Sequence, residues 1–154
     1  MTRTPEETFR ALLDGACRLQ NGDHGQADVL AGCYAEETHV RHPMAPLGDT
    51  PLRSRDALRQ HFAAAGRAGV AGLRVEDVRV HRSADPEVVI GEFTYRGDAG
   101  WEAPGVIVLR VRNGLIVESR DYLDHIGLAR ATGTVDALCA QLTNAQSRLL
   151  RPGT

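Results

Sequence analysis

The chain has 154 residues, of which 42% are hydrophobic and 25% are charged, and its formal net charge is -2. A chain of this size can bury one core but not two of ordinary size, so we expect a single domain over residues 1–154. The net charge is weak and the basic residues are scattered, so the sequence predicts no basic surface for nucleic acid. We therefore expect no nucleic-acid partner.

Two residue types narrow the chemistry and the location. All 18 basic residues are arginine, which excludes Schiff-base chemistry on a lysine. The three cysteines, Cys17, Cys33 and Cys139, have no CxxC spacing and lie in apolar, helix-like contexts, which is typical of reduced core thiols. No apolar run approaches the roughly 18 residues of a membrane span. We therefore expect a cytoplasmic protein without a membrane partner.

The first part of the chain predicts three helices and one short strand. Thr4 and Glu7 form a capping-box pattern around Pro5, which indicates a helix start. The apolar spacing predicts helices over 5–21, 27–34 and, after Ser54 as N-cap, 55–65. A strand is expected over 38–42, and the three prolines after it predict a loop over 43–52.

From Leu73 the apolar period changes to two, which indicates strands. Val78 resumes the alternation out of phase, which predicts a bulge near Glu76 and Asp77. Strands are then expected over 88–95, from 101 through 106–112, and over 115–124. Helices are expected after them, over 125–131 and 134–150. Asn113-Gly114 between the last two strands is typical of a type I′ hairpin turn. The predicted fold class is α+β, with helices covering one face of a curved sheet.

The last predicted strand contains the leading site candidate. Alternation places Leu115, Val117, Ser119, Asp121 and Leu123 on one face and Ile116, Glu118, Arg120 and Tyr122 on the other. If the first face is buried, Asp121 is a carboxylate that points into an apolar interior. Ionised carboxylates are rarely buried without a partner or a function, so Asp121 is a candidate site residue.

The order of elements, the segment YAEETHVRHP before the proline-rich loop and the segment NGLIVESRDYLD together resemble the nuclear transport factor 2-like superfamily. The most similar branch is the SnoaL-like one, with its relatives of polyketide cyclases, ketosteroid isomerase and limonene-epoxide hydrolase. The resemblance covers residues 6–133 and implies a cone-shaped, curved antiparallel (mixed) sheet wrapped around the N-terminal helices. It also implies a deep apolar pocket for a hydrophobic small molecule.

Individual positions carry over from this family only in part. Asp121 stands where the cyclases and epoxide hydrolases have a catalytic aspartate, and His42 stands where the isomerases have their base. Ile107 stands where the cyclases have a histidine and the isomerases have a protonated aspartate, so this polar partner of the catalytic residue is missing. Phe93 and Tyr95 stand where the epoxide hydrolases have an arginine and a second aspartate. The resemblance therefore implies a pocket with proton-transfer residues but no complete copy of a known mechanism.

Each candidate also has a purely structural interpretation. Asp121 could pair with an arginine or with backbone N–H groups, His42 could cap backbone groups beside Pro43, and Tyr95 could be a wall residue with a hydrated hydroxyl. A metal site is not expected, because His39 and His42 point to opposite faces of a strand and no third ligand stands at zinc-like spacing.

Taken together, these residues predict an enzyme that needs no cofactor and transfers protons on a hydrophobic cyclic or polyketide-like molecule, by isomerisation, ring closure or epoxide hydration. His42 and Asp121 are the predicted acid–base pair, and Tyr95 is an extra donor. The predicted substrate-binding residues are Tyr34, Val40, Phe62, Phe93, Trp101, Ile107, Leu109 and Ser119. The alternatives are a ligand-binding protein without catalysis and a dimeric scaffold with a filled pocket. Ile116 and Tyr122 predict a homodimer through the convex face of the sheet.

Overall fold

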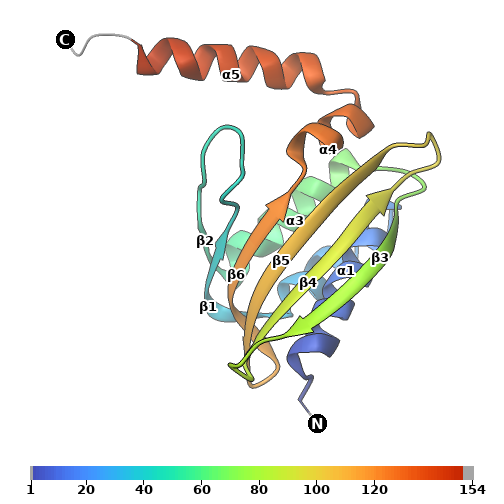
Figure 1. Ribbon diagram of the computed structural model, residues 1–154, viewed down its shortest axis with the longest axis vertical. Helices are drawn as coiled ribbons and strands as arrows, with labels where there is room; N and C mark the ends of the chain where they lie inside the picture. The colour runs from blue at the N-terminus through green and yellow to red at the C-terminus, as the bar shows by residue number, and fades with distance from the viewer. Residues whose placement is uncertain (1, 151–154) are drawn as a thin grey trace.

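The computed structural model describes residues 2–150 and shows a curved sheet with helices packed on one face (Figure 1). The six strands lie in the order β2-β1-β6-β5-β4-β3. The elements are α1 (Pro5–Gln20), α2 (Gln26–Ala31), β1 (Tyr34–Arg41), β2 (Leu52–Ser54), α3 (Arg55–Ala68), β3 (Arg74–Arg82), β4 (Val88–Arg96), β5 (Glu102–Arg112), β6 (Leu115–Leu123), α4 (His125–Thr132) and α5 (Val135–Leu149). The predicted α+β class is confirmed.

The sheet is mixed because β1 runs parallel to β6, while every other pair of neighbours is antiparallel. The turn at Asn113 and Gly114 has φ angles of 52° and 76°, as a type I′ hairpin requires. The predicted bulge in β3 is also present, since the register shifts between Glu76 and Arg79 and Asp77 has a φ of 55°. Both features were readable from turn and alternation patterns.

Helix α1 packs its apolar side against the concave face of the sheet. Thr4 caps it by accepting a hydrogen bond from the backbone N–H of Glu7, whose side chain bonds back to the Thr4 backbone. The ring of Phe9 is fully buried and lies directly over Gly91 of β4. A Cβ atom at Gly91 would stand 2.0 Å from Phe9 Cζ, so this close approach requires glycine.

Two predicted helix ends differ from the structure. The second helix stops at Ala31 rather than near residue 34, and Tyr34 instead begins β1. Helix α3 runs past the predicted end to Ala68, and Gly66 lies inside it, packed against Leu19 of α1. The residue that ends α3 is Gly69, with a φ of 55°. The three-residue strand β2 falls partly in the predicted loop and was missed.

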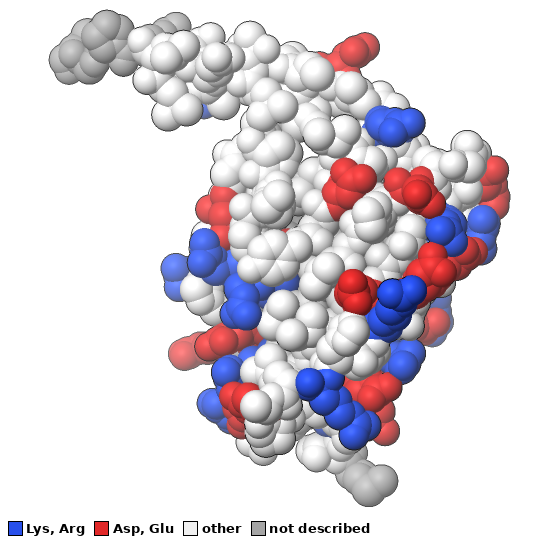
Figure 2. Space-filling model, in the orientation of Figure 1, with Lys and Arg blue, Asp and Glu red and all other residues white. Residues whose placement is uncertain are grey.

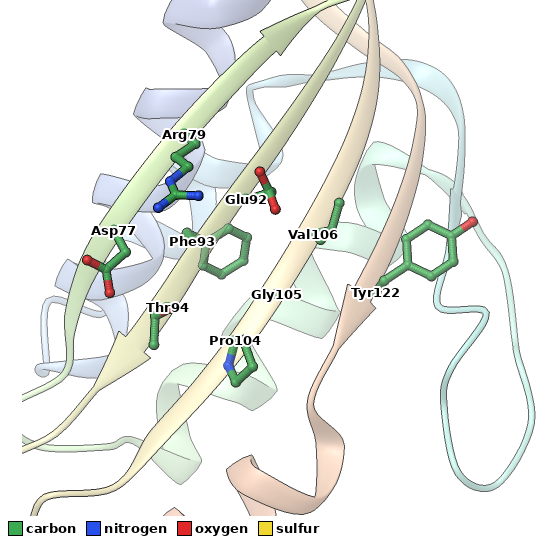
Figure 3. A pocket seen from close by; sticks show the side chains of 9 residues that line it. All are labelled: Asp77, Arg79, Glu92, Phe93, Thr94, Pro104, Gly105, Val106 and Tyr122. Carbon is green, nitrogen blue, oxygen red and sulfur yellow. The ribbon is translucent and has the colours of Figure 1, made fainter.

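Strand β6 differs from simple alternation. The β5–β6 register shifts between Arg110 and Val111, and Ile116 is fully buried together with Ser119. The prediction that Ile116 faces outward is therefore wrong, because an irregularity in the ladder changes the phase of the strand. Tyr122 does lie on the outer face, beside Val106 of β5 (Figure 3).

The C-terminal helices begin where the sequence predicts. Asp124 caps α4 by accepting a hydrogen bond from the Gly127 backbone N–H. Helix α5 has no buried residue and lies across the end of the molecule, away from the sheet (Figure 1). Among residues 2–150, no helix has both the length and the apolar character needed to cross a membrane.

Candidate functional site

A cavity of about 340 Å³ lies between the concave face of the sheet and the helices. Its walls come from α1, α3, α4 and strands β1, β4, β5 and β6, and most of its lining is apolar. The polar exceptions that carry chemistry are His42, His61, Asp121, Tyr34 and Tyr95. An enclosed apolar cavity with a few convergent polar groups is the usual form of a small-molecule site.

Asp121 reaches this cavity from the inner face of β6. Its side chain is 14% exposed, and the Ser119 hydroxyl, two residues earlier on the same face, donates a hydrogen bond to Oδ1. Burial raises the pKa of Asp121, while the Ser119 bond and the nearby His42 oppose this rise. On β5 the residue directly opposite Asp121 is Ile107, so the neighbouring strand gives the carboxylate no polar partner.

His42 follows the last residue of β1 and is anchored through its backbone. The backbone N–H of His42 donates to Asp49 Oδ1 at 2.9 Å, and Arg41 pairs with the other oxygen of Asp49 at 2.7 Å. The His42 backbone bond is the main reason that the pKa of Asp49 lies below its usual value. His42 Nε2 stands 3.8 Å from Asp121 Oδ2, which is too long for a direct hydrogen bond but close enough for charge coupling.

His61 is a second imidazole at this site, and the sequence analysis did not include it. It projects from α3 with its ring centroid 5.7 Å from that of His42. His61 lies at the exposed edge of the cavity, where partial desolvation by neighbouring groups lowers the pKa of its imidazole and the nearby His42 lowers it further. The available signal was helical spacing, since His61 lies three residues after Leu58 and one before Phe62, and all three line the cavity.

Two tyrosine hydroxyls also belong to the cavity. Tyr34 at the start of β1 and Tyr95 near the end of β4 both line it. Burial, followed by the charges of Asp121 and other neighbours, raises the pKa of both phenols. The hydroxyls therefore stay protonated and can donate to a ligand oxygen.

The structure brings together most but not all of the predicted site residues. Asp121, His42, Tyr95, Tyr34, Val40, Phe62 and Ile107 line the cavity. Phe93, Trp101, Leu109 and Ser119 do not.

Each of these four has a structural reason. Phe93 is buried between Phe9 and Tyr95, and Leu109 lies in the fully buried core. Trp101 packs beside the Gly97 turn and borders a different depression, next to Thr132. Ser119 acts on the site only through its bond to Asp121. Among the described residues, no three His, Cys, Asp or Glu side chains are grouped to hold a metal ion.

A second depression lies on the opposite, convex face of the sheet (Figure 3). Its floor includes Pro104, Gly105 and Val106, and the outward ring of Tyr122 stands at one side. The groove is open, and the carboxylate and guanidinium groups at its border, which include Arg79, are exposed or half-buried. Its shape fits a flat contact better than a small-molecule site.

Comparison with known proteins gives a consistent result. The family model described as "SnoaL-like domain" matches residues 11–119. A PhzA/B-like protein of Pseudomonas aeruginosa is 30% identical over 128 residues, which are 77% of this chain and 85% of that protein.

The similar solved structures include two whose names suggest an enzymatic activity. A candidate isomerase from Bacillus subtilis superposes with a TM-score of 0.66 at 22% identity, covering 83% of this chain and 91% of that one. A candidate SnoaL-like polyketide cyclase from Shewanella putrefaciens gives 0.62 at 12% identity, covering 84% and 85%. At such low identity these two structures support the fold and not the activity.

Proposed function

The chain belongs to the SnoaL-like domain family, and on that premise we propose that it transfers a proton on an uncharged, hydrophobic small molecule bound in the cavity. The observation that carries this proposal is the pair formed by His42 and Asp121, 3.8 Å apart in a mostly apolar cavity. Catalysis by proton transfer needs a group that takes a proton and a group that returns one within reach of the same substrate.

Each side chain has a distinct part in the proposed step. Asp121 takes a proton from a carbon next to a substrate carbonyl, because burial makes its carboxylate a stronger base than an exposed aspartate. The Tyr34 and Tyr95 hydroxyls donate hydrogen bonds to the carbonyl oxygen, where negative charge develops. His42 stabilises the carboxylate when protonated and can deliver a proton to the product.

The composition of the cavity wall supports an uncharged substrate. All 18 basic residues of the chain are arginines, but none of them lines the cavity. A carboxylated or phosphorylated molecule would therefore bury its charge without an arginine partner, which is unfavourable. Cyclic or polyketide-like ketones fit this requirement, and both isomerisation and ring closure begin with loss of a proton beside a carbonyl. Epoxide opening would use the same acid–base pair.

One observation favours a second function, ligand binding without catalysis. Ile107 lies directly across the β5–β6 ladder from Asp121, where a polar side chain could assist proton transfer. In this alternative, Asp121 and the tyrosines only orient a ligand in the apolar cavity.

Hydrogen–deuterium exchange separates the two functions without knowledge of the natural substrate. The probe is β-tetralone, a bicyclic ketone, and proton NMR in deuterium oxide follows the loss of the hydrogens beside its carbonyl. We expect the protein to accelerate this exchange and Asp121→Asn to lose at least about 100-fold of the acceleration. His42→Gln should also lose most of it, while His81→Gln, on the exposed edge strand, should not. Binding of the ketone without acceleration would contradict the catalytic proposal and favour the second function.

The convex face of the sheet is the proposed contact for a homodimer. With Ile116 buried, its outward apolar residues are Ile90, Val106, Val108 and Tyr122, which lie on the adjacent strands β4, β5 and β6. These side chains are half-buried in the single chain and form a patch bordered by charged residues, the usual anatomy of a protein–protein contact.

A further inference from the structure

Exposed apolar side chains concentrate at one end of the molecule. Among residues 2–150, eight large hydrophobic residues are exposed, and only Val29 lies elsewhere. The remaining seven belong to the β1–β2 loop, α4, α5 and the residue after α5, and they are Met44, Leu47, Ile126, Val135, Leu142, Leu149 and Leu150. Pro46 of that loop borders a groove together with Leu138 of α5, so loop and helix lie side by side. Soluble monomers rarely leave so many large apolar groups together on the surface.

The four large apolar residues of α5, together with Ala145, follow the spacing of a helix-pairing seam. Val135, Leu138, Leu142, Ala145 and Leu149 are separated by three, four, three and four residues. This repeat places all five along one narrow stripe of the helix. None of them is buried by the rest of the chain, and Leu149 is 86% exposed. The stripe is therefore unpartnered in the single chain.

Charge is almost absent from this helix. Asp136 and Arg148 are its only charged residues, and neither belongs to the stripe. Figure 2 shows α5 as a nearly uncoloured projection, whereas red and blue side chains crowd the body of the molecule. A stripe without charge offers nothing for recognition by a charged partner and nothing to repel an identical stripe.

We propose that α5 is a dimerisation arm that pairs with α5 of a second copy of this chain. The repeat of three and four is self-complementary, because side chains of one such stripe fit between those of an identical one. At 15 residues α5 is about 22 Å long, which is short for a stable helix pair alone. Met44, Leu47 and Ile126 are also exposed at this end of the molecule and add apolar side chains to the proposed contact.

This contact is separate from the proposed contact at the convex face of the sheet. The two surfaces lie on different parts of the chain, one on α5 and its neighbours and the other on β4, β5 and β6. If both operate with two-fold axes that cross at right angles, the full chain forms a closed tetramer, and blocking either contact leaves a dimer.

Molar mass measured by light scattering during size exclusion tests the arm on the full chain. The test variant is Leu142→Glu with Leu149→Glu, which places two charges on the stripe. Its matched control is Ala140→Glu with Ser147→Glu, which places the same charges at the same spacing on the opposite side of α5. We expect the stripe variant to have half the molar mass of the wild type and the control to keep the wild-type mass.

Two further variants make the result decisive. Leu142→Ala with Leu149→Ala keeps the helix propensity and should shift the association to higher protein concentration. Far-ultraviolet circular dichroism should show a folded protein throughout, because α5 contributes no residue to the core. The proposal is overturned if the wild type is monomeric, or if the stripe variant keeps the wild-type mass while a charge on the convex face reduces it.

Discussion

The proposed role of Asp121 in proton transfer comes at the expense of stability. Its carboxylate is nearly buried, and no arginine contacts it within the described residues. Because burial raises its pKa, the unfolded chain ionises Asp121 at lower pH than the folded protein does. The ionised carboxylate therefore lowers the free energy of unfolding at neutral pH.

Asp121→Asn should raise the melting temperature while it removes the exchange activity. Scanning calorimetry should show the gain at neutral pH, at about 2–4 °C for each kcal/mol of free energy of unfolding. The gain should shrink as the pH falls through the raised pKa of folded Asp121, and it should vanish below the ordinary aspartate pKa of about 3.9, where the carboxyl is protonated in both states. Asp14→Asn, at an exposed position of α1, should show no such gain. A lower melting temperature for Asp121→Asn at neutral pH would contradict this account.

The two cavity tyrosines should affect ligand affinity more than stability. Tyr34→Phe and Tyr95→Phe each remove only a hydroxyl and keep the aromatic ring, so the core packing is kept. Affinity for β-naphthol, measured by its fluorescence, should fall about 2- to 10-fold in each variant, the value of one hydrogen bond. Tyr122→Phe on the convex face is the matched control. If all three variants bind β-naphthol equally well, the ligand oxygen does not contact the Tyr34 or Tyr95 hydroxyl.

At the residue scale, the sequence predicted most of the polar residues that line the cavity but not all of them. Alternation along β6 correctly placed Asp121 on the inner face, and the end of β1 placed His42. His61 was missed because its approach depends on how α3 rotates against β1, which helical spacing alone does not define. Ile116 was placed on the wrong face because a ladder irregularity leaves no clear residue signature.

At the scale of elements, the contact of α1 with β4 positions the cavity. The Phe9 ring lies against the Gly91 backbone, and Leu12 and Leu19 of the same helix line the cavity. The distance between helix and sheet is therefore defined by the absence of a side chain at Gly91. Helix ends were harder to predict. Helix α3 was expected to end at residue 65, but it continues through Gly66, which packs against Leu19.

Gly91→Ala should destabilise the protein because the new methyl group would overlap the Phe9 ring. We expect a loss of about 1–3 kcal/mol in the free energy of unfolding, measured by urea titration. Gly25→Ala is the control, because its Cβ would meet no atom closer than 3.5 Å and its change should stay within about 0.5 kcal/mol. An unchanged midpoint for Gly91→Ala would show that α1 can move away from the sheet without cost.

At the scale of the whole molecule, the order of helices and strands predicted the α+β class, and the resemblance carried by two sequence segments added the cone-shaped mixed sheet. The hairpin, the β3 bulge and the two helix caps are local signals, and each agrees with the global arrangement. The exposed course of α5 was not predictable, because the same amphipathic pattern also suits a helix packed on its own domain. Only the arrangement in space shows that its apolar stripe lacks a partner.

Val108→Glu tests the proposed sheet contact at this scale. Val108 lies at the centre of the convex patch, opposite Ile90 on β4. A charge there should halve the molar mass in solution, while Ala64→Glu on the exposed side of α3 should leave it unchanged. Identical masses for wild type and Val108→Glu would contradict dimerisation through this face.

The direct pairing of Ile107 with Asp121 has an evolutionary consequence. Side chains at paired positions on one face of neighbouring strands stand about 5 Å apart, so a histidine or aspartate at position 107 would reach the Asp121 carboxyl without any change of backbone. A single substitution at position 107 would therefore turn the present apolar wall into a pair of two carboxyl groups or a pair of a carboxyl group and an imidazole. Descendants of such a chain can exchange one reaction for another, or lose and regain catalysis, while they keep the same scaffold.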